Sequence, residues 1–170
     1  TQKKYKEAIP DYDKAIALNP NSEEAYYYRA LTNYNLDAYT AALPDFDRAI
    51  ELNPDVASMH YWRGEVKYML KQYEEAIIDF SKSLELSRNN DEPPFNSRAN
   101  CYYMLKKYKE ARKDYTKAIE LVPNDAFSDK YYRGICNYNL DLTQEALNDF
   151  LSYLEKDPND PYILVMTAHS

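Results

Sequence analysis

The chain has 170 residues, 45% of them hydrophobic, which is enough apolar material for a packed core and too much for a disordered segment. It carries 28 acidic and 21 basic side chains, for a net charge of −7. This balance argues against nucleic acid as a partner and favours a basic or amphipathic protein or peptide. The longest strongly apolar run, residues 163–166, is too short to cross a bilayer, so we expect no membrane insertion.

One eleven-residue stretch recurs along the chain. Each copy has a small residue first, an aspartate fourth and an aromatic ring fifth. The copies begin at Ala8, Ala42, Ala76, Ala111 and Ala146. Successive copies are therefore 34 or 35 residues apart, and a fixed period of this length indicates stacked repeats.

Apolar residues three and four positions apart predict a helix over 4–18, and the turn at 19–22 ends it, with Ser22 as the cap of the next helix. Pro10 and Pro44 fall inside expected helices, where we predict a kink or a loosened first turn. The remaining helices are expected in pairs: 23–36 with 39–52, 57–70 with 73–86, 92–105 with 108–121, and 127–140 with 143–156.

The first helix of each pair, called the leading helix below, has its own pattern. An arginine comes thirteen residues before the motif alanine, a small residue follows it, and a tyrosine and a leucine come five and seven residues after it. Small residues let two helix axes approach, and large rings opposite them fill the groove. The pattern therefore predicts tightly packed helix pairs.

A helix pair with Tyr-x-Arg-Gly/Ala, Tyr-x-Leu, Tyr-x-Glu-Ala and Asp-Tyr/Phe resembles the tetratricopeptide repeat. The unit at 57–90 carries it at Tyr61, Arg63, Gly64, Tyr68, Leu70, Tyr73, Glu75, Ala76, Asp79, Phe80 and Leu84. The resemblance covers nearly the whole chain and implies an all-α fold, a right-handed α-solenoid of antiparallel helix pairs. The pentatricopeptide family has a similar period and reads RNA, but the spacings of 34 and the acidic balance argue against it.

We predict a single repeat domain over 1–170 with incomplete units at its ends. The complete repeats are expected over 21–54, 55–90, 91–124 and 125–159. Residues 1–20 form a half unit with a second helix only, and 160–170 form a partial leading helix or cap. The cap is expected to fold back on Leu147, Leu151 and Leu154. Alternatively it completes the first helix of a neighbouring copy, which would give weak head-to-tail self-association.

The arginine series and the motif aspartates predict ion pairs that tie the helices together. Each arginine is expected to hydrogen-bond an aspartate of its own or an adjacent unit. The residues concerned are Arg29, Arg63, Arg98 and Arg133 with Asp45, Asp79, Asp114 and Asp149. The alternative is a ladder of cations for an acidic ligand, for which an acidic chain is poorly suited.

In the family that the chain resembles, one face of each leading helix lines a concave groove that holds a peptide or a partner helix. Here that face, with its flanking rings, comprises Tyr27, Tyr28, Leu31, Tyr34, Tyr61, Trp62, Glu65, Tyr68, Asn96, Asn100, Tyr103, Tyr131, Tyr132, Ile135 and Tyr138. Tyrosine and tryptophan supply binding energy at little rotamer cost. The alternative is that many of these rings only pack between adjacent repeats.

Some relatives hold the acidic tail of a chaperone with lysine, arginine and asparagine on three leading helices. The corresponding positions here carry Tyr27, Leu31, Trp62, Pro93 and Ser97. One repeat later they carry Tyr61, Glu65, Ser97, Ser128 and Tyr132. Neither set supplies the cations or amides, so this ligand is disfavoured.

The sequence contains no recognisable catalytic or cofactor site. With 2 glycines there is no phosphate loop, and His60 is expected to be a satisfied or surface imidazole. Cys101 and Cys136 are expected to be two small buried thiols beyond disulfide reach, which favours the cytoplasm. The predicted function is a noncatalytic protein–protein interaction scaffold. The alternatives are an assembly element that associates end to end, and a targeting domain cut from a larger protein or enzyme.

Overall fold

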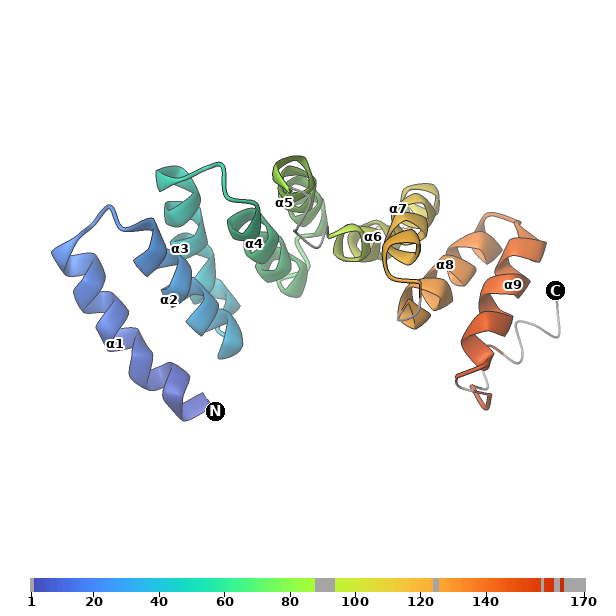
Figure 1. Cartoon of the computed structure of the whole chain (residues 1–170), viewed down its shortest axis with the longest axis horizontal. Coiled ribbons are helices and arrows are strands. Elements are labelled where there is room, and N and C mark those ends of the chain that lie inside the picture. Colours follow the sequence, from blue (N-terminus) through green and yellow to red (C-terminus); the bar gives the residue numbers. More distant parts are fainter. Residues whose placement is uncertain (1, 88–93, 124–125, 157, 161–162, 164–170) are drawn as a thin grey trace. The chain divides into compact units, whose positions relative to one another are not determined.

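The computed structural model describes residues 2–87, 94–123, 126–156, 158–160 and 163. Over these residues the chain forms helices and no strands (Figure 1). The helices are α1 (Gln2–Leu18), α2 (Glu23–Asn35), α3 (Tyr39–Leu52), α4 (Ala57–Met69), α5 (Tyr73–Leu86), α6 (Phe95–Met104), α7 (Tyr108–Leu121), α8 (Phe127–Asn139) and α9 (Thr143–Leu154). The predicted class, an all-α helical-repeat solenoid, is confirmed.

The chain divides into two compact units, Thr1–Pro94 with α1 to α5 and Phe95–Ser170 with α6 to α9. Within each unit, a helix packs mainly on the helices before and after it in sequence. The leading helices are α2, α4, α6 and α8, and each pairs with the helix that follows it. Helix α1 is a second-type helix, and none of its residues is buried.

A left-handed residue ends each leading helix one residue earlier than the sequence predicts. In the first pair, the amide of Ala38 donates to the carbonyl of Asn33 and that of Asp37 to Tyr34, both at 2.9 Å. These bonds satisfy helix carbonyls that would otherwise lack a partner. The residues with positive φ, between 57° and 61°, are Asp37, Lys71, Lys106 and Asp141.

The core of each pair is built from a small residue on the leading helix against a ring on its partner. Phe80 and Phe150 are fully buried, and a Cβ added to Gly64 or Gly134 would lie 2.8 Å or 2.5 Å from the ring edge of Phe80 or Phe150. These glycines are therefore required by close approach. In the other two pairs alanine takes the position, at Ala30 against Phe46 and at Ala99 against Tyr115.

Three sequence expectations concern the course and the ends of the helices. Pro10 and Pro44 are exposed and lie inside α1 and α3, and the kink or loosened first turn stays a prediction. Helix α6 begins at Phe95, later than residue 92. Of the expected C-terminal cap, the structure describes Ile163, which is buried in a cluster with the partly buried Leu154, whereas Leu151 is 51% exposed. Residues 161–162 and 164–170 lie outside the described residues, so the cap stays a prediction.

Candidate functional site

Each leading-helix arginine donates two hydrogen bonds to the aspartate sixteen residues further along, on the partner helix. The Nε and Nη2 atoms reach the two carboxylate oxygens at 2.6–2.9 Å. The pairs are Arg29–Asp45, Arg63–Asp79, Arg98–Asp114 and Arg133–Asp149. Such forked contacts are the strong form of the ion pair, and the aspartates are buried. These arginines hold the helix pairs together and are not a ladder of open cations.

The third guanidinium nitrogen, Nη1, reaches back to the preceding second-type helix. In the first unit it donates to a second carboxylate, from Arg29 to Asp13 at 2.6 Å and from Arg63 to Asp47 at 2.9 Å. In the second unit, Arg133 instead donates to the hydroxyl of Thr116 at 3.4 Å. One anchoring carboxylate is therefore replaced by a neutral group at the α7–α8 junction.

Asp79 is the most heavily contacted of these carboxylates. Besides Arg63, it accepts a hydrogen bond from Lys67 Nζ at 2.8 Å. Burial alone would raise the pKa of Asp79, but His60, Arg63 and Lys67 together lower it to about 2. The His60 Nδ1 atom is 3.8 Å away, beyond hydrogen-bonding distance, so we assign most of this lowering to the two nearer cations.

His60 corrects a sequence expectation. It is buried, and only its Nε2 atom is satisfied, by the carbonyl of Pro54 at 2.8 Å. Its Nδ1 atom is buried without a hydrogen-bond partner. The predicted satisfied or surface imidazole is therefore wrong for one of the two ring nitrogens. Cys101 and Cys136 are buried as expected, and burial raises the pKa of the Cys136 thiol to about 12.

In the first unit, the leading-helix rings are half-buried and pack against both neighbouring helices. Tyr27 meets Phe46 with ring centroids 6.0 Å apart, and Tyr34 meets Trp62 at 5.2 Å across α2 and α4. Tyr61 packs similarly on Phe80, at 5.9 Å. Leu31, Glu65 and Tyr68 are half-buried as well, and Tyr28 is 51% exposed.

In the second unit, the residues of the predicted groove face differ more in exposure than the sequence predicts. Tyr103 meets Tyr132 at 5.1 Å, and Tyr131 meets Tyr153 at 4.9 Å. Ile135 is buried in the core with Ala146, Phe150 and Ile163, so it is not available on an open face. Asn100 accepts a hydrogen bond from the Tyr115 hydroxyl at 2.6 Å, Asn96 is exposed, and Tyr138 is 44% exposed.

Among the described residues, four large apolar side chains stand open on the leading helices. They are Tyr28 and Met69 in the first unit and Met104 and Tyr138 in the second, and each unit's pair is called its leading-helix face below. The two methionines were not among the residues predicted from the sequence. The signal that could have identified them is that each directly follows a tyrosine of the predicted groove face. Met69 and Met104 are 44% and 46% exposed.

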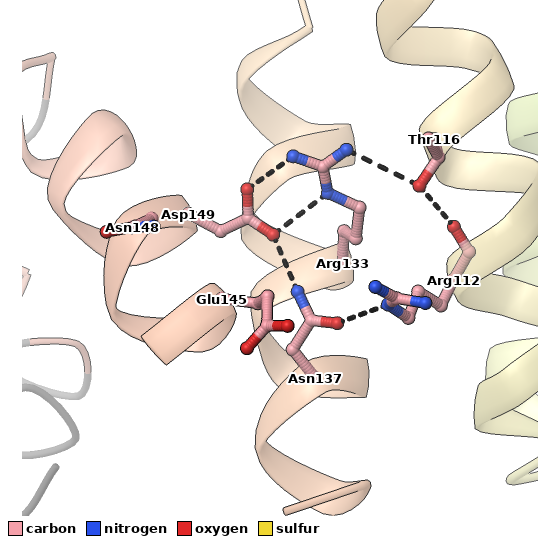
Figure 2. Close-up of a pocket in the computed structure, with 7 residues that line it drawn as sticks. All are labelled: Arg112, Thr116, Arg133, Asn137, Glu145, Asn148 and Asp149. Carbon is pink, nitrogen blue, oxygen red and sulfur yellow. Dashed lines mark hydrogen bonds and ion pairs between the residues drawn. The ribbon is translucent and has the colours of Figure 1, made fainter. Parts of the chain in front are cut away.

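A polar pocket of about 240 Å³ lies between α7, α8 and α9 (Figure 2). Successive residues of a helix are rotated by about 100° around its axis, so residues 133 and 137 point roughly opposite to residues 131, 135 and 138. The pocket therefore lies on the other side of α8 from the predicted groove face. Its lining residues are Arg112, Thr116, Arg133, Asn137, Glu145, Asn148 and Asp149. Sequence reasoning identified only Arg133 and Asp149 among them.

Five of these side chains form a closed ring of hydrogen bonds (Figure 2). Arg133 donates to Asp149 and Thr116, Thr116 donates to the carbonyl of Arg112, and Arg112 Nε donates to Asn137 at 2.7 Å. Asn137 then donates to Asp149 at 2.9 Å. The ring fixes the side chains that form the floor of the pocket.

Neither the pocket nor the rest of the described chain groups three histidine, cysteine, aspartate or glutamate side chains as a metal site requires. No helix in the described part of the chain is long and apolar enough to span a membrane.

Comparison with protein families gives two matches. The model described as "Tetratricopeptide repeat" matches residues 94–125. The model described as "Anaphase-promoting complex, cyclosome, subunit 3" matches residues 1–83. No curated protein sequence matches the chain.

Several solved structures have the same fold. YrrB, described as a TPR protein with an unusual peptide-binding site, is 27% identical with a TM-score of 0.81, over 92% of this chain and 79% of that one. MamA from Desulfovibrio magneticus RS-1 is 20% identical with a TM-score of 0.82, over 92% and 88%, and shows the fold alone. The first TPR of Spaghetti (RPAP3), bound to the HSP90 peptide SRMEEVD, is 29% identical with a TM-score of 0.57, over 61% and 82%.

Proposed function

Because the chain belongs to the tetratricopeptide repeat family, we propose that it is a noncatalytic scaffold that binds a peptide or a partner helix on its leading helices. The family supports a role in protein–protein interaction. Two of the similar structures are described by what they bind, a peptide site in YrrB and an HSP90 peptide in RPAP3. The peptide surface of this chain, with the residues below, is our proposal.

The observation that carries it is the leading-helix face of each unit. Met69 and Met104 are exposed, and the tyrosine before each of them, Tyr68 or Tyr103, packs its ring on a tyrosine of the next helix. Fixed rings lose little entropy when a partner covers them, and methionine adapts to irregular partner surfaces.

The partner is expected to be basic or amphipathic. The chain has a net charge of −7, and Glu65 lies on the predicted groove face of α4. The arginines of the leading helices are already neutralised by their aspartates, so they add no free positive charge to this face. A basic segment would be attracted to the surface as a whole and would present apolar side chains to the open rings and methionines.

A random displayed-peptide library selected on the whole chain tests the proposal. Selected peptides are remade and their affinity is measured for two triple variants. The first, Met69→Ser/Met104→Ser/Tyr138→Ser, removes large apolar side chains from the leading-helix faces of the two units. The second, Ile78→Ser/Leu121→Ser/Leu151→Ser, makes the matched change at exposed apolar positions of the second-type helices. We expect the first to weaken binding about tenfold or more and the second to leave it unchanged. Equal affinity for both variants would refute the proposal.

One observation favours a second candidate, end-to-end association. In α3, α5, α7 and α9 the motif alanine, aspartate and ring are buried, whereas α1 buries none of its residues. The side chain of Asp11 is 81% exposed and contacts only Lys14, at 3.9 Å, among the described residues. Sedimentation velocity distinguishes the candidates, because association through α1 requires a concentration-dependent mass that Tyr12→Glu abolishes.

A further inference from the structure

Arg112 departs from the internal repeat at the junction of α7 and α8, and two further polar residues meet it there. Arg112 stands where the other copies have Ile9, Leu43, Ile77 and Leu147. Thr116 stands where the first two copies have Asp13 and Asp47. Asn137 has an asparagine counterpart in α2, Asn33, and stands where α4 has Lys67. All three line the polar pocket, and Arg112 places a charged group there where every other copy has an apolar residue.

The hydrogen-bond capacity left over in the pocket includes the donors of Arg112 and the exposed carboxylate of Glu145. Arg112 uses only its Nε, on Asn137, and its Nη1 and Nη2 groups have no acceptor in the described part of the chain. Arg133 Nη1 has only the long 3.4 Å contact to Thr116. Both oxygens of Asp149 are already bonded. The fork of Arg112 is also fixed in orientation, since Asn137 holds its Nε and is itself held by Asp149.

The charges of the lining residues determine how much negative charge the pocket can accept. Arg133 and Asp149 neutralise one another, and Arg112 faces the pocket with Glu145 as the other charged lining residue. Glu145 makes no ion pair within 4.0 Å among the described residues, and it is exposed, so solvent screens it. One free guanidinium can balance a single negative charge. A doubly charged phosphate would leave an excess of negative charge next to Glu145 and Asp149.

We propose that this pocket binds the carboxylate of an aspartate or glutamate side chain of a partner protein, held by the fork of Arg112 and the Nη1 group of Arg133. The planar carboxylate accepts two parallel bonds from a guanidinium, and the pocket volume suits one side chain. The same position in the first unit already holds a carboxylate, that of Asp47 on Arg63. The protein origin of the carboxylate rests on the proposed scaffold function, whereas the pocket chemistry does not.

The direct test is a titration of the isotope-labelled whole chain, followed by the side-chain N–H resonances of arginine and asparagine. The probes are acetate and the blocked peptide acetyl-Ala-Glu-Ala-amide, with chloride at matched ionic strength and inorganic phosphate as separate arms. We expect saturable shifts at Arg112 and Asn137, with a dissociation constant of roughly 1–50 mM for a single charge-assisted contact. Arg48, an exposed arginine paired with Glu51, is the control and should not saturate.

Three variants sharpen the test. Arg112→Leu restores the residue type of the other copies and should abolish the shift of Asn137, whose resonance remains observable in this variant. Thr116→Asp restores the carboxylate of the first unit, fills the pocket from within and should abolish the shifts at Arg112 and Asn137. Glu145→Gln removes the nearby negative charge and should tighten acetate binding severalfold. Both restored residues occur naturally at equivalent positions, at Leu43 and Asp47, so the variants are expected to fold.

Each outcome of the titration either supports or overturns the proposed carboxylate site. Saturation by acetate and the glutamate peptide, lost in Arg112→Leu and Thr116→Asp, supports the proposal. No saturation, unchanged shifts in Arg112→Leu, or tighter binding of phosphate than of acetate overturns it. Binding that appears only in Glu145→Gln also overturns it, because Glu145 is then the partner of Arg112. Peptides selected on the leading-helix face should bind Arg112→Leu normally, which separates failure here from failure of the proposed function.

Discussion

Asp79→Asn tests whether the buried ion pairs hold the repeats together. The carboxylate is 1% exposed and accepts hydrogen bonds from Arg63 at 2.6 and 2.9 Å and from Lys67 at 2.8 Å. Replacing it with an amide keeps the shape but leaves two cations beside a neutral group. Breaking a buried pair by removing one charge costs about 3–5 kcal/mol in other proteins. We expect the variant to fold with reduced stability at neutral pH.

The pH dependence gives the magnitude independently. The pKa of Asp79 is about 2 in the folded chain against 3.8 for the free side chain, a lowering worth about 2 kcal/mol at about 1.4 kcal/mol per pH unit. The folded pKa lies below the unfolded one, so this stabilisation is complete above pH 3.8 and is lost as the pH falls through about 2. The stability gap between wild type and Asp79→Asn should shrink by about that amount over this interval.

Urea unfolding followed by circular dichroism and Trp62 fluorescence, from neutral pH to about pH 2, measures the gap. The matched control is Asp47→Asn, which touches the same Arg63 from the other side but is 49% exposed. An exposed pair contributes about 1 kcal/mol or less, so this control should lower stability only slightly. A gap between wild type and Asp79→Asn that stays constant down to the lowest pH would refute the reasoning.

Three further substitutions probe the backbone and the packing, each measured as a urea midpoint. Pro44→Ala should stabilise the chain by up to about 3 kcal/mol, since it restores an exposed mid-helix hydrogen bond, whereas Ile78→Ala at the equivalent place in α5 should be close to neutral. Lys71→Gly should stabilise by about 1 kcal/mol because it relieves a φ of 61°. Gly134→Ala should destabilise by about 1 kcal/mol, since strain of about 1–3 kcal/mol against Phe150 exceeds the gain in helix propensity. An unchanged midpoint for Pro44→Ala, Lys71→Gly or Gly134→Ala would contradict the expectation for that variant, and a large shift for the control Ile78→Ala would contradict its own.

The fold was predictable because its information is local and repeated. Helices α3, α5 and α7 begin and end where the apolar period predicts, and the capping bond of Ser22 to Ala25 forms as expected. The ends of the leading helices were placed one residue too late. The reason is that their left-handed residues are aspartate or lysine, whereas the sequence signal for that conformation is glycine or asparagine.

The candidate site was only partly predictable, since the sequence period describes average positions. A constant offset of sixteen residues was enough to pair each arginine with its aspartate. Burial at single positions was not readable in the same way. Ile135 falls on the predicted groove face yet belongs to the core, and Asn100 is taken by the hydroxyl of Tyr115. Both depend on how deeply the neighbouring helix covers each position.

We expect the α7–α8 junction to contribute less to the stability of the fold than the equivalent junctions of the other repeats. The apolar residues at this position in the other copies are only partly buried, so each contributes less than the about 1.5–3 kcal/mol of a fully buried side chain. The stem of Arg112 recovers a part of that contribution. The contact of Asp47 with Arg63 is an exposed pair that contributes about 1 kcal/mol or less, and at the α7–α8 junction Thr116 replaces it with a longer contact, 3.4 Å against 2.9 Å. Neither change is needed to close the helix pair, because Arg133 and Asp149 are fully joined without them. The departures lower stability and leave a fixed, open guanidinium, and that combination is characteristic of a site that binds a ligand.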